Sequence, residues 1–267
     1  MKQLEGKRAL ITGSLRGIGF GIAEVFAREG AEIVLHGLGD DVAISAAQNR
    51  IRELGASKVE VFNHDLRDSK AIESLMREAM NLGAIDILVN NAGIQHTAPT
   101  AEMPPEKWDE IIAINLSSAF HTMRFALPKM AERGFGRVIN IASVHGLVAS
   151  VAKAPYVAAK HGLVGMTKVV ALEYANVGSR ESGGVTVNAI CPGWVETALI
   201  ESQIQARADK FNGDRVQGIA DLLSEKQPSR RLSSPNDIGE LALWLCSKSA
   251  HNVTGTSIPV DGGWTAQ

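Results

Sequence analysis

Tyr156 and Lys160 are the side chains in this 267-residue sequence that are best suited to acid–base chemistry. They are four residues apart, so a helix would place both on one face. A free phenol has a pKa of about 10 and is a weak base at neutral pH. A neighbouring ammonium favours the phenolate and moves the tyrosine towards the range of efficient proton transfer. The pair predicts a tyrosine that exchanges a proton with a substrate oxygen, which Ser143 can hold by a hydrogen bond.

A glycine-rich loop near the N-terminus is suited to binding a dinucleotide. Residues 12–19 read TGSLRGIG, directly after an apolar run and before a helical pattern. Glycines permit a tight turn and a close backbone approach, and the start of the next helix offers free N–H groups to a pyrophosphate. The GxxxGxG spacing alone would also fit a plain tight turn. Its position between a strand and a helix favours a cofactor site.

The residues after the second expected strand, 36–40 (HGLGD), bear on the choice of cofactor. An acidic residue at this place binds the ribose of NAD, whereas a cation binds the 2′-phosphate of NADP. Both are missing, and the lack of the cation favours NAD. Asp65, after the third strand, fits the adenine edge and fits a helix cap about equally well. Arg16, inside the glycine loop, keeps NADP open as an alternative.

Short apolar runs alternate with helical patterns along the whole chain. Strands are expected at residues 8–12, 32–36, 58–62, 85–90, 137–142, 185–190 and 257–260, and helices at 18–28, 40–54, 68–82, 106–130, 155–176 and 235–247. Strands this apolar are buried on both faces. The alternation predicts an α/β fold: one Rossmann-type domain over residues 1–267, with a doubly wound parallel sheet of about seven strands and helices on both faces.

Two segments are additions to this alternation. Residues 179–184 (SRESGG) are expected to form a surface loop. Residues 196–227 follow the carboxyl end of a strand, where such sheets bind ligands, and are expected to form a lid over the substrate.

The composition limits the possible partners and locations. Charged residues make up 21% of the chain and the formal net charge is −2, so nothing in the charge favours nucleic acid or an anionic membrane as a partner. Cys191 and Cys246 form no CxxC pair, and no Cys/His cluster has zinc spacing. The N-terminus does not have the pattern of a signal peptide, and no apolar stretch reaches the ~18 residues of a membrane span. We therefore expect a cytoplasmic protein.

The sequence also resembles the short-chain dehydrogenase/reductase family over essentially its whole length. The matching motifs, in chain order, are the glycine loop 13–19, NNAG at 90–93, Asn115, Ser143, YVAAK at 156–160 and Pro192-Gly193. Each is common alone, but their order and spacing together are specific. The resemblance implies an NAD(P)(H)-dependent oxidoreductase in which the cofactor performs the redox step. It implies catalytic roles for Asn115, Ser143, Tyr156 and Lys160, with Asn115 anchoring a proton-relaying water and Lys160 also holding the cofactor ribose.

The same resemblance implies a set of cofactor-binding residues. They are Gly13, Ser14, Arg16, Gly17, Ile18, Gly19, Leu38, Asp65, Leu66, Asn91, Ala92, Gly93, Tyr156, Lys160, Pro192, Gly193, Val195 and Thr197. The members of this family are usually homotetramers. In some of them a structural divalent cation lies near the C-terminal carboxylate, which here belongs to Gln267. No other metal site is expected.

Lys153 is notable because the surrounding stretch GLVASVAKAPY is otherwise apolar. With Gln95 and His145 it looks like a donor set for a small anion such as a carboxylate. From spacing alone, a solvated Lys153 and a merely packed His145 are equally acceptable.

Runs such as NNAGIQH, INIASVHGLV and VDGGWTAQ are similar to the bacterial D-3-hydroxybutyrate dehydrogenases within the family. That resemblance implies NAD as cofactor and a short hydroxy or keto acid as substrate. The substrate residues it implies are Gln95, Ser143, His145, Lys153, Tyr156, Trp194, Gln203 and Trp264. The two glutamines, His145 and Lys153 would bind the carboxylate, and the two tryptophans would enclose the methyl end. Glu196 departs from the pattern, because an apolar residue is expected there.

Two other functions remain possible. A 3-oxoacyl-[acyl-carrier-protein] reductase shares the fold and the Ser143, Tyr156 and Lys160 set. Such an enzyme would prefer NADPH, held by a base such as Arg16, and would need a wide groove for a pantetheine arm. A nucleotide-sensing protein without turnover would be expected to lose the Tyr/Lys pair, which is intact here.

Overall fold

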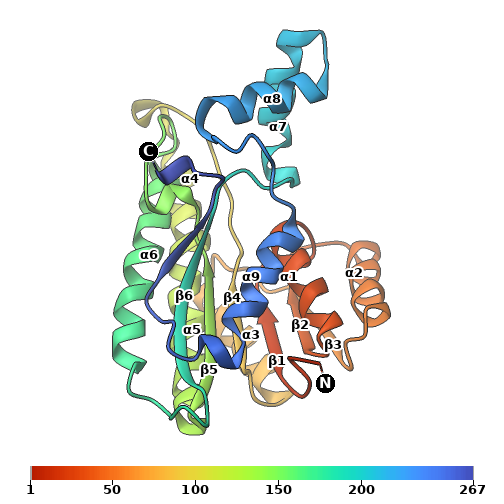
Figure 1. The fold of residues 1–267 in the computed structure, drawn as a ribbon, viewed down its shortest axis with the longest axis vertical. Helices are drawn as coiled ribbons and strands as arrows, with labels where there is room; N and C mark the ends of the chain where they lie inside the picture. Colours follow the sequence, from red (N-terminus) through yellow and green to blue (C-terminus); the bar gives the residue numbers. More distant parts are fainter. Residues whose placement is uncertain (1, 267) are drawn as a thin grey trace.

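A seven-stranded parallel sheet is the centre of the computed structural model, which describes residues 2–266 (Figure 1). The strands are β1 (Arg8–Ile11), β2 (Glu32–His36), β3 (Val59–Phe62), β4 (Ile87–Asn90), β5 (Phe135–Ile141), β6 (Gly184–Pro192) and β7 (Ser257–Val260). Their order is β3-β2-β1-β4-β5-β6-β7, and all neighbouring pairs are parallel. The prediction of a parallel sheet of about seven strands is confirmed. The strand order reverses between β1 and β4, so the crevice at their carboxyl ends is where this fold binds ligands.

Helices cover both faces of the sheet. They are α1 (Gly17–Arg28), α2 (Asp41–Glu53), α3 (Ser69–Asn81), α4 (Pro105–Ile112), α5 (Ser118–Arg133), α6 (Ala154–Tyr174) and α9 (Pro235–Leu245). Successive strand residues point to opposite faces. Ile11 therefore packs with Phe26 of α1 in one core cluster, whereas Leu10 packs with Met76 of α3 in another. Core clusters on both faces hold the sheet between the helices, as the alternation predicted.

The expected helix over residues 106–130 is interrupted. In the structure α4 ends at Ile112, a π-helical segment spans Ala113–Ser117, and α5 then continues to Arg133. Gly134 ends α5 in the left-handed conformation (φ 66°), which glycine adopts without strain. Asn115 lies within the π-helical segment, a distortion that is frequent at functional sites.

The segment over residues 196–227 forms a helical hairpin that projects beyond the carboxyl ends of the strands (Figure 1). Its helices are α7 (Ala198–Ala208) and α8 (Arg215–Lys226). Ile200 and Ile204 of α7 pack with Leu222 of α8 in a small cluster of their own. The hairpin is therefore held together by contacts that are separate from the main cores.

The structure adds three findings on metals, membranes and thiols. Gln267, at which a structural cation was expected, lies outside the described residues, and within residues 2–266 no group of three or more His, Cys, Asp or Glu side chains could hold a metal ion. Over the same range, no helix combines the length and the apolar character that a membrane crossing needs. Cys191 and Cys246 are buried free thiols.

Candidate active site

Helix α6 brings Tyr156 and Lys160 together. Both side chains are buried, and the Lys160 Nζ lies 5.7 Å from the centre of the Tyr156 ring. The Nζ also donates a hydrogen bond of 2.7 Å to the Ile141 carbonyl at the end of β5. That bond ties the helix to the sheet and leaves two of the three ammonium donors for a ligand.

Burial controls the ionisation of this pair. It lowers the pKa of Lys160 to about 8. Burial also raises the pKa of Tyr156, although the Ser143 hydroxyl opposes that change. The lowering of the tyrosine pKa that the lysine alone was expected to cause is therefore absent, because removing both charged forms from water outweighs their attraction at this distance.

Ser143 and His145 lie directly after β5. The Ser143 Oγ accepts a hydrogen bond from the His145 backbone N–H at 3.2 Å and lies 3.3 Å from the His145 Nδ1. The other ring nitrogen, Nε2, lies 2.9 Å from the Ser150 Oγ. Burial first, and then the charges of Lys153 and Lys226, lower the pKa of His145 to about 4. The imidazole is therefore neutral at ordinary pH.

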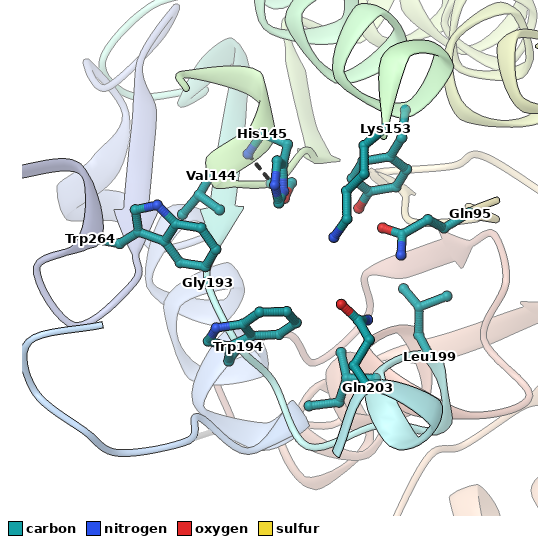
Figure 2. Close-up of a pocket in the computed structure, with 12 residues that line it drawn as sticks. Gln95, Val144, His145, Lys153, Gly193, Trp194, Leu199, Gln203 and Trp264 are labelled. Carbon is teal, nitrogen blue, oxygen red and sulfur yellow. Dashed lines mark hydrogen bonds between the residues drawn. The ribbon is translucent and has the colours of Figure 1, made fainter. Parts of the chain in front are cut away.

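A cavity of about 370 Å³ opens beside Ser143 and Tyr156 (Figure 2). All eight side chains expected to bind substrate line it, together with Val144, Gly193, Leu199 and Ile200. Figure 2 shows the polar ends of Lys153, Gln95 and Gln203 converging across the cavity. Leu199 and Ile200 belong to α7, and sequence reasoning did not select them, because apolar residues in a lid carry no signal of their own.

Aromatic side chains form another wall of this cavity. The rings of Trp194 and Trp264 lie 5.7 Å apart between centres, and the Lys153 Nζ lies 5.7 Å from the centre of the Trp194 ring. Lys153 is buried, and burial together with the charge of Lys226 lowers its pKa. No carboxylate within residues 2–266 forms an ion pair with Lys153. An anionic ligand would supply the missing partner.

A second hollow of about 330 Å³ adjoins the first and shares Ser143 and Tyr156 with it. Six of the residues expected to bind the cofactor line it: Ile18, Tyr156, Pro192, Gly193, Val195 and Thr197. Two ligands bound in these hollows would therefore meet at the serine and the tyrosine, as a hydride donor and a hydride acceptor must.

The glycine loop packs tightly against the NNAG turn after β4. A Cβ added to Gly13 (φ +63°) would lie 2.8 Å from the Ala92 Cα, so no other residue fits there without displacement. The Asn91 Nδ2 donates to the carbonyls of Thr12 and Gly13, both at 2.9 Å. Ser14, which was expected to bind the cofactor, is fully buried: its hydroxyl donates to the Ile11 carbonyl and its backbone N–H donates to the His36 carbonyl, so it stabilises the loop. The loop is thus a rigid cradle whose glycines are required by close backbone contacts.

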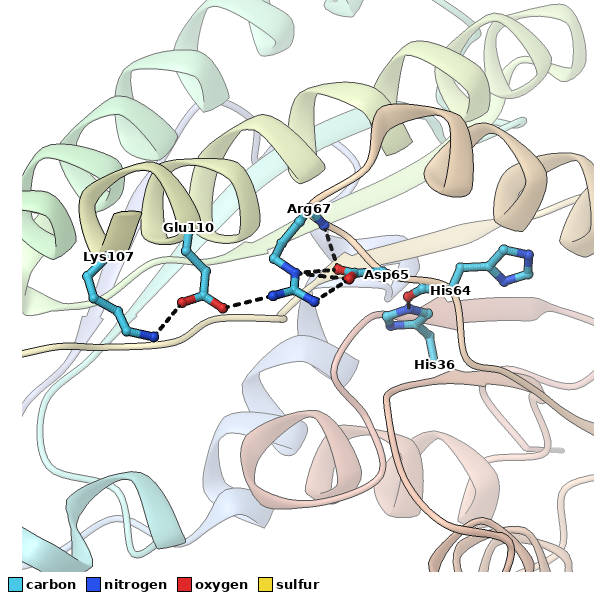
Figure 3. A network of polar contacts seen from close by, with 6 residues as sticks. All are labelled: His36, His64, Asp65, Arg67, Lys107 and Glu110. Atoms are coloured by element: carbon cyan, nitrogen blue, oxygen red, sulfur yellow. Dashed lines mark hydrogen bonds and ion pairs between the residues drawn. The ribbon is translucent and has the colours of Figure 1, made fainter. Parts of the chain in front are cut away.

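The edge expected to bind adenine carries a network of charged side chains (Figure 3). Asp65 accepts hydrogen bonds from the Arg67 Nε at 2.9 and 3.0 Å, and Arg67 contacts Glu110 of α4 at 3.4 Å. The hydrogen bonds from Arg67 lower the pKa of Asp65. The interpretation of Asp65 as a helix cap is wrong, because Asp68 caps α3 by accepting from the Lys70 N–H.

His36 occupies the end of β2, where an NAD-binding acid would be expected. Its Nδ1 accepts from the Gly13 N–H at 3.3 Å, so its Nε2 carries the proton and donates to the His64 carbonyl at 2.8 Å. Burial lowers the pKa of His36. The neutral His36 ring therefore stabilises the glycine loop by accepting from the Gly13 N–H. Leu38 is exposed at the rim, whereas Leu66 is buried.

Asn115 acts on the turn that follows β4. Its Nδ2 donates to the Ile94 carbonyl and its Oδ1 accepts from the Ile94 N–H, both at 2.9 Å. A Cβ added to Gly93 would lie 3.5 Å from the Asn115 Oδ1 and 3.7 Å from the Lys160 Nζ. Asn115 and Lys160 therefore both lie against Gly93, and the hydrogen bonds of the Asn115 side chain hold the turn.

Comparisons with known proteins agree with this geometry. A family model described as enoyl-(acyl carrier protein) reductase matches residues 13–265. The chain is 51% identical over 266 residues to the D-beta-hydroxybutyrate dehydrogenase of Cupriavidus necator, covering 99% of this chain and 100% of the relative. It is 45% identical over 262 residues to the enzyme of that name from Rhizobium meliloti, covering 98% and 99%.

Solved structures of other reductases share this fold. The L-sorbose reductase from Gluconobacter frateurii, complexed with NADPH and L-sorbose, superposes with a TM-score of 0.92 at 29% identity over 100% of both chains. A 3-oxoacyl (acyl-carrier-protein) reductase from Agrobacterium tumefaciens with NADP bound superposes with a TM-score of 0.86 at 31% identity, covering 98% of this chain and 95% of that chain. Such folds bind a nicotinamide cofactor, and the cradle and hollow described above fit one. This chain belongs to the short-chain dehydrogenase/reductase family.

Proposed function

We propose that the protein interconverts D-3-hydroxybutyrate and acetoacetate by hydride transfer to and from NAD. The observation that carries the proposal is the buried Lys153, which forms no ion pair among the described residues 2–266 and lies in a cavity that also holds Ser143 and Tyr156. The space of about 370 Å³ includes the open mouth of the cavity, so the enclosed part suits a short acid. The two curated relatives bear the name of this activity.

In the oxidation of the hydroxy acid, the Ser143 hydroxyl holds the substrate oxygen and Tyr156 accepts its proton. A nicotinamide cofactor held by the residues of the adjoining hollow would supply the redox chemistry, as the acceptor of the hydrogen and bonding electrons of the adjacent carbon. Lys160 stabilises the phenolate and holds the cofactor ribose with its remaining donors. In the reverse reaction Tyr156 returns the proton.

The carboxylate is bound by Lys153, with Gln95 and Gln203 as neutral donors. A cation already removed from water gives up little hydration when an anion arrives, so its attraction is largely preserved. The two tryptophans of the facing wall enclose the methyl end. His145 was also expected to contact the carboxylate, but this would require its Nε2 to turn from Ser150 towards the substrate.

We propose NAD as the cofactor because the exposed Leu38 stands where a cation would bind the 2′-phosphate of NADP. Arg16 is exposed in the glycine loop and is the base that could reverse this preference. The α7–α8 hairpin (residues 198–226) is proposed to act as the substrate lid, because Gln203 and Leu199 of α7 line the cavity. A cytoplasmic homotetramer is proposed from the family resemblance.

The test is spectrophotometric. Formation of NADH would be measured with D-3-hydroxybutyrate, its L-enantiomer, its methyl ester and simple alcohols, with NADP in parallel, and acetoacetyl thioesters would be tested for reduction. The proposal expects the D-acid with NAD to give the largest kcat/KM. A preference for a thioester with NADPH would instead support the 3-oxoacyl carrier-protein reductase, the alternative that Arg16 keeps open.

A further inference from the structure

Four side chains from separate parts of the chain form a continuous line that ends at the reacting centre. Lys226, at the end of α8, donates from Nζ to the Ser150 Oγ at 3.2 Å. Ser150, in the loop before α6, lies 2.9 Å from the His145 Nε2. The His145 Nδ1 lies 3.3 Å from the Ser143 Oγ. Sequence analysis assigned no role to Lys226 or Ser150, because they are 76 residues apart.

The first hydrogen bond favours one direction for the others. A lysine ammonium has three donors and no acceptor, so Ser150 must accept from it. Within residues 2–266 the only acceptor that the Ser150 hydroxyl contacts is the His145 Nε2, so donating its proton there satisfies both groups. A neutral imidazole has one protonated nitrogen, so a bare Nε2 leaves the proton on Nδ1. The Nδ1–H in turn donates to the Ser143 Oγ.

This arrangement decides what Ser143 can do. Its oxygen accepts two hydrogen bonds, one from the His145 Nδ1–H and one from the His145 backbone N–H. A hydroxyl oxygen has two acceptor sites and one proton. With both acceptor sites occupied, Ser143 is left with its proton, which can only be donated. With the other tautomer, that proton would be given to His145.

We propose that Lys226 is a positioning residue that selects, through Ser150, the Nδ1–H tautomer of His145 and so makes Ser143 a hydrogen-bond donor to the substrate oxygen. Only the identity of that oxygen rests on the function proposed above; the tautomer does not. In the resting protein the His145 Nε2 then carries no proton, so His145 can donate to a carboxylate only after its contact with Ser150 is broken.

Two further observations fit this role. His145 is buried, and its pKa of about 4 means that the ring carries a single proton at ordinary pH. The nitrogen that carries this proton decides whether Ser143 accepts from the ring or donates to it. The end of α8 is also attached to the cavity wall. The Lys226 Nζ lies 5.6 Å from the centre of the Trp264 ring. The side chain of the neighbouring Gln227 accepts a hydrogen bond of 3.2 Å from the backbone N–H of Trp194. The line from Lys226 to Ser143 is therefore complete when the α7–α8 hairpin packs against the cavity wall.

The direct test is NMR of the resting protein with ¹⁵N-labelled histidine, because the two tautomers give distinct ring-nitrogen shifts. The chain has seven histidines, and a His145→Gln variant identifies the signals of His145. The wild type is expected to show an unprotonated Nε2 and a protonated Nδ1. Lys226→Met keeps the apolar stem but removes the donor, and should give the Nε2–H form or a mixture. Lys226→Arg retains a group that can only donate and should keep the wild-type tautomer.

Kinetics supply the second readout. Lys226→Met should lower kcat by about tenfold, less than the factor on the order of 10²–10³ that complete loss of an oxyanion donor costs, because the Ser143 hydroxyl remains in place. Ser150→Ala should have a similar effect, and the double variant should be no worse than either alone, because both interrupt one line. Lys210→Met, in the same hairpin, is the matched control and should change neither readout.

Three outcomes would overturn the proposal. The first is a wild-type His145 with its proton on Nε2. The second is an unchanged tautomer in Lys226→Met. The third is a loss in Lys226→Met that appears with the hydroxy acid but not with its methyl ester, which would make Lys226 a direct carboxylate ligand. If D-3-hydroxybutyrate is not a substrate, the NMR result still decides the tautomer, so the two proposals fail separately.

Discussion

Burial determines the ionisation of the groups at the reacting centre. Tyr156 and Lys160 are both enclosed, and each loses hydration that its charged form needs. A protein places such groups in its interior at a cost in stability, and strongly shifted pKa values of this kind mark functional sites. Their energetics can be tested one residue at a time.

Tyr156→Phe removes the hydroxyl that is proposed to exchange the proton. Turnover should fall by a factor on the order of 10²–10⁴, the usual contribution of a general acid or base. NADH binding, followed by fluorescence, should persist because the ring remains in place. Tyr174→Phe, in the same helix, is the matched control and should retain near wild-type turnover. An active Tyr156→Phe enzyme would exclude this residue from the proton transfer.

Lys153→Ala removes the cation from the substrate cavity. Losing one partner of a desolvated charge pair costs about 2–5 kcal/mol, and about 1.4 kcal/mol corresponds to a factor of ten. The kcat/KM for D-3-hydroxybutyrate should therefore fall by at least roughly tenfold, with little change in NAD affinity. The wild type should discriminate against the methyl ester, and the variant should lose most of that discrimination. An equal loss on acid and ester would assign Lys153 to structure or chemistry instead.

Lys160 should make stability depend on pH in a defined window. Its pKa is about 8 in the folded protein and 10.5 for an ordinary lysine, so between these values the unfolded chain binds more protons. The free energy of unfolding therefore rises with pH in that window. Below about pH 8 the folded protein bears the whole penalty, about 3 kcal/mol.

Urea unfolding of the cofactor-free protein at pH 7 to 10 would measure this effect. Relative to Lys160→Met, the wild type should gain up to about 3 kcal/mol as the pH rises through this range. Lys168→Met, at an exposed position of the same helix, should show a constant difference from the wild type. A constant difference for Lys160→Met as well would mean that Lys160 keeps an ordinary pKa in the fold.

Among the elements, the α7–α8 hairpin has the most independent structure. Its small apolar cluster is separate from the cores of the sheet. Arg215, at the start of α8, also forms ion pairs with Glu201 of α7 at 2.9 Å and with Glu196, before α7, at 3.6 Å. This explains Glu196, which departed from the expected apolar residue: it is exposed and pairs with a cation of α8. Elements with few contacts to the core are the ones that open locally.

Gly218→Val should separate the two helices of the hairpin. A Cβ at Gly218 would lie 2.6 Å from the Ala208 backbone N, so α7 must move and displace Gln203 and Leu199 from the cavity. Overpacking of this kind costs about 1–3 kcal/mol, so KM for the hydroxy acid should rise roughly tenfold. Hydrogen exchange should increase over residues 198–226 and stay unchanged in the sheet.

Ser224→Val, at an exposed position of α8, is the matched control and should leave both KM and exchange unchanged. A Gly218→Val protein with normal KM and a loosened hairpin would show that the hairpin does not act as a lid. Protection of residues 198–208 on adding NADH and acetoacetate to the wild type would support the lid directly.

At the scale of the whole molecule, exposed apolar side chains mark a surface suited to assembly. Phe120 of α5 and Val169 and Leu172 of α6 are 49%, 56% and 80% exposed. The two helices contact each other on one face of the sheet. Exposed large apolar side chains on neighbouring helices are typical of interfaces between subunits.

Light scattering is expected to give a mass of four chains for the wild type. Val169→Asp combined with Leu172→Asp should reduce this mass, because buried, unpaired carboxylates oppose an apolar interface. Val151→Asp, at a 92% exposed loop position, is the matched control and should remain tetrameric. A wild-type monomer, or a tetramer that tolerates the double substitution, would contradict the assembly proposed for this face.

Local pattern was sufficient to predict the sheet, the order of its elements and the pairing of Tyr156 with Lys160. Strand alternation and helical spacing depend on near neighbours in the chain, so they can be recognised without coordinates. The family motifs extended this to the residues that line the two hollows. The same approach missed the helices of the hairpin, because their apolar positions serve a small local cluster and give a weak pattern.

The protonation and the connections of those residues required the folded chain. Burial, and not the neighbouring ammonium, dominates the pKa of Tyr156, and burial is a property of the whole packing arrangement. Asp65 is held by Arg67 while Asp68 caps the helix, a choice made by backbone geometry. Lys226 reaches Ser150 only because α8 folds back over the carboxyl end of the sheet. Contacts between distant segments arise from chain topology, which no local spacing encodes.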